Sequence, residues 1–162
     1  MLSTGSVMRP RKPARDAAPV AAFWDTSGIV PLCCYQSYTG AARKATRAYR
    51  RQVTWWTTPV EIVGSFNRLH RERTLTPEEL GQALQRLDLL RSRWNEIQPS
   101  DEVRDTAERL LAVHKLRAAD ALQLAAALVW CSHRPRGRHF IGADGALALA
   151  AEAEGFTVIR LL

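Results

Sequence analysis

The sequence has few cysteines and lacks any apolar run long enough to cross a membrane. The three cysteines are Cys33, Cys34 and Cys131, and an odd number with two adjacent does not suit the disulfide framework of a small secreted domain. No spacing of Cys and His residues matches a zinc site. A membrane helix needs about 20 apolar residues in succession. We therefore expect a cytoplasmic protein with reduced, partly buried thiols and no membrane association.

The N-terminal segment also contains few apolar residues. Residues 1–18 contain several Arg and Pro residues and almost nothing apolar after Val7. This composition predicts a disordered basic N-terminal extension, followed by one domain over residues 19–162.

Acidic residues are also outnumbered. The 162-residue chain has 23 Lys and Arg against 16 Asp and Glu, which gives a net charge of +7. Such a balance favours a polyanionic partner, either nucleic acid or an acidic protein. A basic surface that only keeps the protein soluble is the simpler alternative.

The order of apolar and polar residues predicts alternating strands and helices. Short apolar runs predict strands at residues 20–24, 52–58, 94–99, 140–144 and 156–162. Amphipathic or apolar stretches predict helices at residues 34–51, 58–73, 76–90, 103–111, 117–130 and 145–154. This alternation indicates an α/β domain with a mostly parallel central sheet of four to five strands and helices on both faces.

Four acidic residues fall where such a topology brings them to one edge of the sheet. Asp25 and Asp144 end predicted strands, whereas Glu61 and Asp120 lie at the starts of predicted helices. In a parallel sheet the ends of strands and the starts of the following helices share the edge where ligands bind. We therefore expect the four carboxylates to converge.

Each of these residues also has an ordinary structural role available. Asp25 can cap its own turn and Asp144 can cap the last helix. Glu61 can form a capping box with Thr58. Asp120 can cap its helix, with the glutamine three residues later as its partner.

Convergence would place four like charges in one cleft. Mutual repulsion would protonate some of them unless a cation neutralises the group. Oxygen ligands favour Mg²⁺ or Mn²⁺, and either ion can activate water for attack on a phosphodiester. An acidic metal cleft within a basic surface is typical of a nuclease.

Four segments of the sequence carry a family resemblance. "FWDTSGIV", "TTPVEIVGSFNRLHRE", "LRAADALQLAAAL" and "FIGADGALALAAEAEGFTVI" resemble successive motifs of the PIN-domain ribonucleases, in particular the VapC toxins of type II toxin–antitoxin systems. The resemblance runs in order from Val20 to Leu162, and "LRAADALQLAAAL" is its most specific part.

The resemblance implies a PIN-like three-layer sandwich and a Mg²⁺-dependent endoribonuclease, with Mn²⁺ able to substitute. It also implies an RNA substrate, inhibition of translation or growth, a homodimer, and a small antitoxin protein as partner. Asp25 and Asp120 would be the principal metal ligands, Glu61 and Asp144 would complete the catalytic site, and Ser27 would support it with a hydroxyl group. The alternative is a catalytically inactive PIN-like module that binds RNA or protein.

The sequence departs from this family pattern at two places. Gly142 stands where family members often carry Thr or Ser, and a hydroxyl group at that position could orient water or metal. The basic extension of residues 1–18 is also not part of the pattern.

Overall fold

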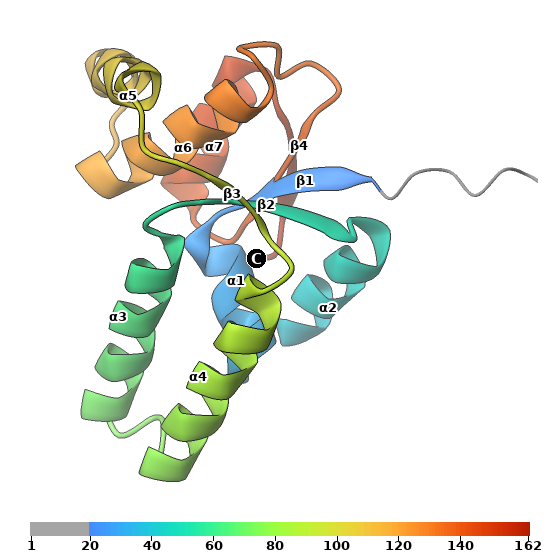
Figure 1. Cartoon of the computed structure of the whole chain (residues 1–162), viewed down its shortest axis with the longest axis vertical. Coiled ribbons are helices and arrows are strands. Elements are labelled where there is room, and N and C mark those ends of the chain that lie inside the picture. Colours follow the sequence, from blue (N-terminus) through green and yellow to red (C-terminus); the bar gives the residue numbers. More distant parts are fainter. Residues whose placement is uncertain (1–19) are drawn as a thin grey trace, which may run out of the picture.

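The computed structural model describes residues 20–162, so the expected basic extension lies outside the described residues. Helices and strands alternate along this part of the chain (Figure 1). Their order is β1 (Ala21–Trp24), α1 (Thr26–Cys33), α2 (Thr39–Ala48), β2 (Arg51–Trp55), α3 (Thr58–Arg71), α4 (Pro77–Arg91), β3 (Asn95–Ile97), α5 (Asp101–Val113), α6 (Ala118–Trp130), β4 (His139–Gly142), α7 (Gly145–Glu154) and β5 (Thr157–Arg160).

The five strands of residues 20–162 form one sheet in the order β3-β2-β1-β4-β5. Every neighbouring pair is parallel. The central strand is β1, in which Phe23 is aligned with Val53 of β2 and with Phe140 of β4. The prediction of a mostly parallel sheet of four to five strands is therefore confirmed, and the sheet is parallel throughout.

Helices cover both faces of this sheet (Figure 1). On one face, Phe23, Val53 and Phe140 belong to a core cluster that includes residues of α5, α6 and α7. On the other face, Trp24 and Ile141 belong to a cluster with residues of α1, α2, α3 and α4. Because both faces are covered, β1 is apolar along its length instead of alternating. The architecture is a PIN-like three-layer sandwich.

The predicted helix over residues 34–51 is confirmed only in part, as the shorter helix α2, and the helix α1 before it was not predicted. Residues 26–33 already form α1, and α2 begins only at Thr39. Asp25 is the N-cap of α1, and its carboxylate accepts a hydrogen bond from the backbone N–H of Gly28 at 3.0 Å. This cap satisfies one of the backbone donors that every helix start leaves free.

A proline inside α1 explains why this helix is not evident from the sequence. Pro31 lacks the N–H group that would bond to the carbonyl of Ser27. The hydroxyl of Tyr38 donates to that carbonyl instead, at 3.4 Å. A tertiary contact thus replaces the missing helical hydrogen bond.

Two other predicted helix boundaries are confirmed. Thr76 and Glu79 form a capping box at the start of α4, and Gly155 ends α7 in the left-handed region with φ of 111°. No helix of residues 20–162 is long and apolar enough to span a bilayer.

Candidate active site

A pocket at the carboxyl ends of the strands collects acidic side chains from four separate parts of the chain. The pocket has a volume of about 340 Å³. Its lining includes all four carboxylates that the topology was expected to bring together: Asp25, Glu61, Asp120 and Asp144. Their convergence is observed, and their catalytic roles stay predictions.

Asp25 lies between β1 and α1 and is 3% exposed. Its backbone N–H donates to the carbonyl of Ile141 in β4 at 3.1 Å, which extends the β1–β4 pairing by one residue. Its carboxylate accepts from the Ser27 hydroxyl, at 2.8 and 3.0 Å from the two oxygens. Together with the bond from Gly28, these contacts show that Asp25 caps α1 as well as lining the pocket.

Burial raises the pKa of the Asp25 carboxyl from its ordinary value of 3.8 to about 7. The hydrogen bonds from Ser27 and Gly28 lower this pKa, while the negative charges of Asp144 and Asp120 raise it. Without a bound cation, Asp25 therefore exchanges a proton close to neutral pH. A divalent cation beside it would favour the ionised form.

Gly142 allows Asp25 to occupy this position. A Cβ atom at residue 142 would lie 2.6 Å from one carboxylate oxygen of Asp25 and 2.8 Å from the other. Such distances are much shorter than van der Waals contact. The Asp25 carboxylate thus occupies the space that a larger side chain at residue 142 would need.

Ser27 connects Asp25 to the segment that carries the fourth acidic residue. Its hydroxyl donates to Asp25 and accepts from the backbone N–H groups of Ala143 at 2.7 Å and Asp144 at 3.3 Å. The Asp144 carboxylate in turn accepts from the N–H of Leu147 at 2.8 Å. Asp144 therefore caps α7, which is the structural role that the sequence offered for it.

Glu61 does not form the expected capping box with Thr58. Thr58 is the first residue of α3 and is fully buried, and the residue before the helix makes no side-chain cap bond. The carboxylate oxygens of Glu61 instead accept from the hydroxyls of Thr57 at 2.8 Å and Thr26 at 2.9 Å. Donors from two segments therefore fix the orientation of Glu61 in the pocket.

Asp120 is not the N-cap of α6 either. That position belongs to Arg117, and Asp120 lies in the first helical turn, where the helix dipole favours negative charge. The guanidinium of Arg117 donates to the Asp120 carboxylate at 3.2 Å. Because the Arg117 side chain is 83% exposed, this ion pair contributes little to stability, and Asp120 stays accessible to a ligand.

Basic and polar residues complete the pocket. Arg68 and Ser65 of α3 line it, together with Tyr38 and Gln36 from the segment before α2. Within residues 20–162, Arg68 has no carboxylate within ion-pairing distance. Its guanidinium is therefore available to an anionic ligand in the pocket.

The oxygen donors in the pocket are of the chemical type that a hard divalent cation prefers. Four carboxylates supply the oxygen ligands that Mg²⁺ and Mn²⁺ prefer, and two of them already raise the pKa of Asp25 by their charge. Among the described residues, no three His, Cys, Asp or Glu side chains are grouped closely enough to form a metal site. The carboxylates share one pocket but would have to move closer together to share one ion.

No feature of the sequence points directly to the residues that hold Glu61. Thr26 and Thr57 were not recognised, and Gln123 was considered only as a capping partner of Asp120, whereas its amide contacts Glu61. A polar residue in a helix that is otherwise apolar all round was the signal available for Gln123.

No protein-family model and no curated protein sequence match the chain. Solved structures do. A toxin–antitoxin complex from Klebsiella pneumoniae has a chain that is 19% identical with a TM-score of 0.60, and the match covers 88% of this chain and 98% of that one. A protein from Pyrobaculum aerophilum is 21% identical with a TM-score of 0.54, and the match covers 88% and 90% of the two chains. At these identities the similarity shows a shared fold.

Proposed function

We propose that the protein is a Mg²⁺-dependent endoribonuclease of the PIN-domain, VapC-like type, which acts as the toxin of a toxin–antitoxin pair. The observation that carries the proposal is the convergence of four acidic side chains from separate segments in one pocket (Asp25, Glu61, Asp120 and Asp144). The pocket lies at the carboxyl edge of a parallel sheet, where α/β folds bind their ligands.

In this proposal the four carboxylates would hold Mg²⁺, or Mn²⁺ in its place. The bound ion would polarise a phosphoryl oxygen and lower the pKa of a water molecule that attacks the phosphodiester. Ser27 fixes the Asp25 carboxylate by a hydrogen bond, and Thr26 and Thr57 fix that of Glu61. These bonds restrict the side chains before substrate arrives, which favours the electrostatic part of catalysis.

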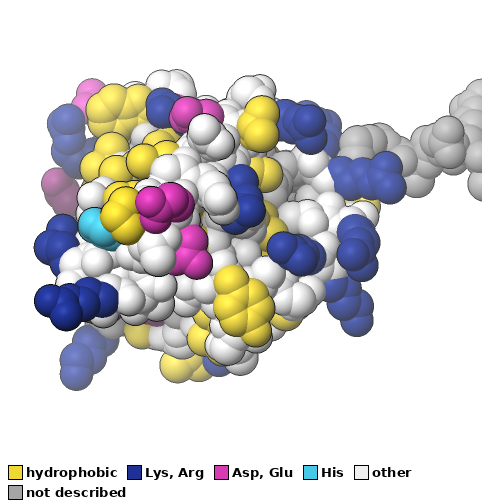
Figure 2. Space-filling view, turned by 90° about the horizontal axis from the view of Figure 1, so that it is seen from below, with side chains coloured by type: hydrophobic (Ala, Val, Ile, Leu, Met, Phe, Trp, Pro, Cys, Tyr) yellow, Lys and Arg dark blue, Asp and Glu magenta, His cyan; other side chains and the backbone are white. Residues whose placement is uncertain are grey.

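Basic residues at the pocket provide contacts for the RNA backbone. Arg68 and Arg117 line the pocket with the four carboxylates, and both are exposed. Lys and Arg side chains also lie at both sides of the face seen from below in Figure 2, so exposed basic residues are not confined to the pocket. Cations around an acidic centre can hold the phosphates of a nucleic acid while the carboxylates hold the metal.

The role as a toxin is supported by the shared fold with a chain of a toxin–antitoxin complex. We propose that this protein likewise has a small antitoxin partner, that it forms a homodimer, and that it acts on RNA in the cytoplasm. Expression of the protein alone should then stop bacterial growth, and the Asp25→Ala variant should not.

The activity is tested with purified protein and single-stranded RNA. Cleavage should require Mg²⁺, stop on addition of EDTA, and leave 5′-phosphate and 3′-hydroxyl ends. The Asp120→Asn variant should lose activity by more than about 100-fold because it lacks a ligand charge. Asp105→Asn, an exposed change on α5, serves as the control and should cleave normally. Cleavage by Asp120→Asn at the parental rate would contradict the proposal, and RNA binding without EDTA-sensitive cleavage would favour the inactive binding module.

A further inference from the structure

The side-chain amide of Gln123 lies beside the candidate ligands. Gln123 follows Asp120 by three residues on α6, is 1% exposed, and lines the same pocket. Its nitrogen lies 3.0 Å from the hydroxyl of Thr26, 3.1 Å from that of Thr58, and 3.2 and 3.3 Å from the two carboxylate oxygens of Glu61. Four oxygen atoms therefore surround one amide nitrogen.

The two amide protons of Gln123 cannot serve all four of these oxygen atoms equally. The Thr26 hydroxyl gives its own proton to Glu61 and so faces Gln123 as an acceptor. The amide has two protons, and an ionised carboxylate is the strongest acceptor within reach. Together with the hydroxyl of Thr57, the amide thus holds both oxygens of Glu61 with uncharged donors.

Gln123 also joins the segments that carry three of the carboxylates. Thr26 directly follows Asp25, and Glu61 belongs to the first turn of α3. Gln123 itself lies on the helix of Asp120. A single amide therefore links the starts of α1 and α3 to α6.

The carbonyl oxygen of Gln123 lowers the stability of the folded protein. The carbonyl oxygen of Gln123 is buried and has no hydrogen-bond partner among the described residues. A buried polar atom without a partner costs about 1–3 kcal/mol. Turning the amide over would remove this problem only by placing the carbonyl oxygen against the Glu61 carboxylate, which is repulsive. An apolar residue would suit the surrounding helix better, since most of α6 is buried and apolar.

We propose that Gln123 is a positioning residue, whose amide sets the place of the Glu61 carboxylate in the pocket and thereby the affinity of the site for a divalent cation. The inference rests on the proposed function. Gln123 is not itself a ligand in this assignment, because its carbonyl oxygen is enclosed by protein. It acts through Glu61.

The test compares the Mn²⁺ affinity of Gln123→Met with that of the parent, measured by titration calorimetry without RNA. Methionine has a similar length but no donor, so the affinity should fall by about 10-fold or more, as when other residues that support metal ligands are replaced. Gln52→Met is the matched control. Gln52 is the other buried glutamine of the described residues, and its carbonyl oxygen accepts from the indole of Trp94, away from the pocket. This control should lower stability and leave the Mn²⁺ affinity unchanged.

A double substitution shows whether Gln123 acts through Glu61. In a Glu61→Ala background there is no carboxylate for the amide to hold, so adding Gln123→Met should change the Mn²⁺ affinity less than about 2-fold. An equal loss in both backgrounds would overturn the assignment. If Gln123→Met does not fold, Gln123→Asn retains the amide but withdraws it by one methylene group, and the same loss of affinity is expected.

Failure of this inference can be told apart from failure of the proposed function. Equal Mn²⁺ affinity in the parent and in Gln123→Met would overturn the role of Gln123 and leave the nuclease proposal standing. A parent protein that neither binds Mn²⁺ nor cleaves RNA would overturn the proposed function and the inference together.

Discussion

At the scale of single residues, Asp25 couples the chemistry of the pocket to the stability of the fold. It is the buried cap of α1 and has a pKa raised by burial to about 7, against an ordinary value of 3.8. Between these two pH values the folded protein holds a proton that the unfolded chain releases. Without metal, stability should therefore fall as pH rises from about 4 to about 7.

Asp25→Asn should remove this dependence. Asparagine stays uncharged and can still accept the hydrogen bond from Gly28. In EDTA at pH 8 we expect the variant to be more stable than the parent by up to about 4 kcal/mol, with little difference near pH 4. Urea unfolding at both pH values measures the effect. Asp105→Asn, exposed on α5, should have the same stability as the parent at both pH values. An Asp25→Asn variant that is less stable than the parent at pH 8 would refute the argument.

Gly142 gives a second prediction at this scale. In Gly142→Ala the new methyl group would force the Asp25 carboxylate away from its bonds to Ser27 and Gly28. Such overpacking costs about 1–3 kcal/mol, and Mn²⁺ affinity should fall as well because the displaced group is a candidate ligand. Thermal unfolding and Mn²⁺ titration measure the two effects.

The control is Gly64→Ala in α3, where an added Cβ meets no atom within 4 Å. That change should stabilise the protein by about 0.5–1 kcal/mol, since alanine is more stable than glycine in the interior of a helix. A Gly142→Ala protein that keeps full stability and Mn²⁺ affinity would show that Asp25 can leave its place without loss.

The acidic residues of the pocket could be predicted from the sequence, and the family resemblance pointed to Ser27 beside Asp25. The residues that hold Glu61 could not be predicted. Asp25 and Asp144 follow apolar strands, and a parallel topology brings such positions together. Thr57 has no comparable signal, because hydroxyl side chains occur throughout a soluble protein. Gln123 stands out only as a polar residue in a mostly apolar helix. Their role depends on which side chains lie opposite them, and the sequence does not specify that.

At the scale of helices and strands, boundaries decided by local chemistry were predictable. Thr76 with Glu79 and Gly155 mark helix ends by bonds within a few residues. The helix α1 was not predicted because Pro31 is unfavourable inside a helix. The hydrogen bond that replaces the missing one comes from Tyr38, in the segment before α2. Tertiary contacts override local preference at that point.

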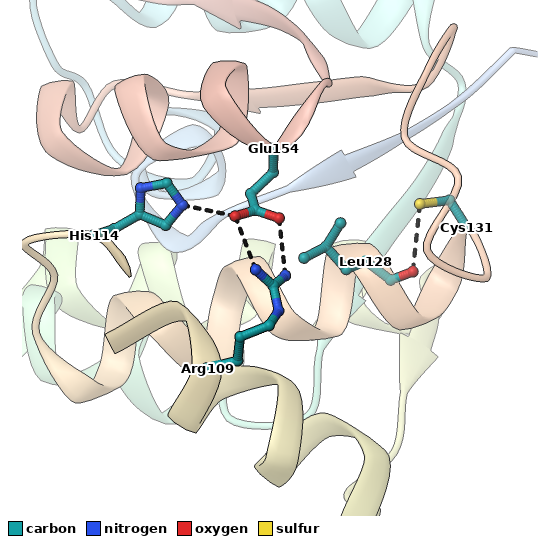
Figure 3. Close-up of polar contacts among 5 residues, drawn as sticks. All are labelled: Arg109, His114, Leu128, Cys131 and Glu154. Carbon is teal, nitrogen blue, oxygen red and sulfur yellow. Dashed lines mark hydrogen bonds and ion pairs between the residues drawn. The ribbon is translucent and has the colours of Figure 1, made fainter. Parts of the chain in front are cut away.

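Glu154 at the end of α7 contacts Arg109 of α5 and His114, which directly follows that helix (Figure 3). Both carboxylate oxygens of Glu154 accept from the guanidinium of Arg109, at 2.8 and 3.2 Å, and the ring of His114 lies 2.7 Å from one of them. The hydrogen bond from Arg109 lowers the pKa of Glu154, burial opposes the change, and the bond from His114 adds to it. The ionised carboxylate therefore stabilises the folded state.

Glu154→Gln should lower stability by about 1–2 kcal/mol at pH 7. A lowered folded pKa means that the stabilisation is present above the unfolded value of 4.5 and is lost as pH falls through the folded value. The difference between variant and parent should therefore shrink in acid. Urea unfolding at pH 7 and pH 3 measures it.

Glu152→Gln on the same helix is the control. Glu152 pairs with Arg160, but both side chains are more than 40% exposed, so the change should cost less than about 0.5 kcal/mol. Equal losses for the two variants would show that burial of the Glu154 cluster adds nothing.

At the scale of the whole molecule, the sheet explains why residues distant in sequence form one site. All strand pairs of residues 20–162 are parallel, so the chain returns to the same edge after each helix. The alternation of strands and helices was enough to predict this edge. Distances between the carboxylates were not predictable, since they depend on packing such as the close approach of the Asp25 carboxylate to the backbone of Gly142.

The net charge of +7 leads to a prediction about the path of RNA. The helix α2 exposes Arg43 and Arg47, one turn apart, and begins next to Tyr38, which lines the pocket. Replacing both arginines by glutamate should weaken binding of single-stranded poly-uridine RNA. The slope of log affinity against log salt should become shallower by about 0.7 for each lost phosphate contact. Binding is measured in EDTA, so that cleavage does not interfere.

The control reverses the same number of charges in another segment of the chain. Arg134 and Arg136 are exposed in the segment before β4, and therefore lie at the amino edge, away from the pocket. If RNA follows α2 into the pocket, changing these two arginines to glutamate alters the slope less than the α2 variant does, although net charge falls equally. Equal effects of the two variants would mean that only total charge attracts RNA, and that α2 does not guide it to the carboxylates.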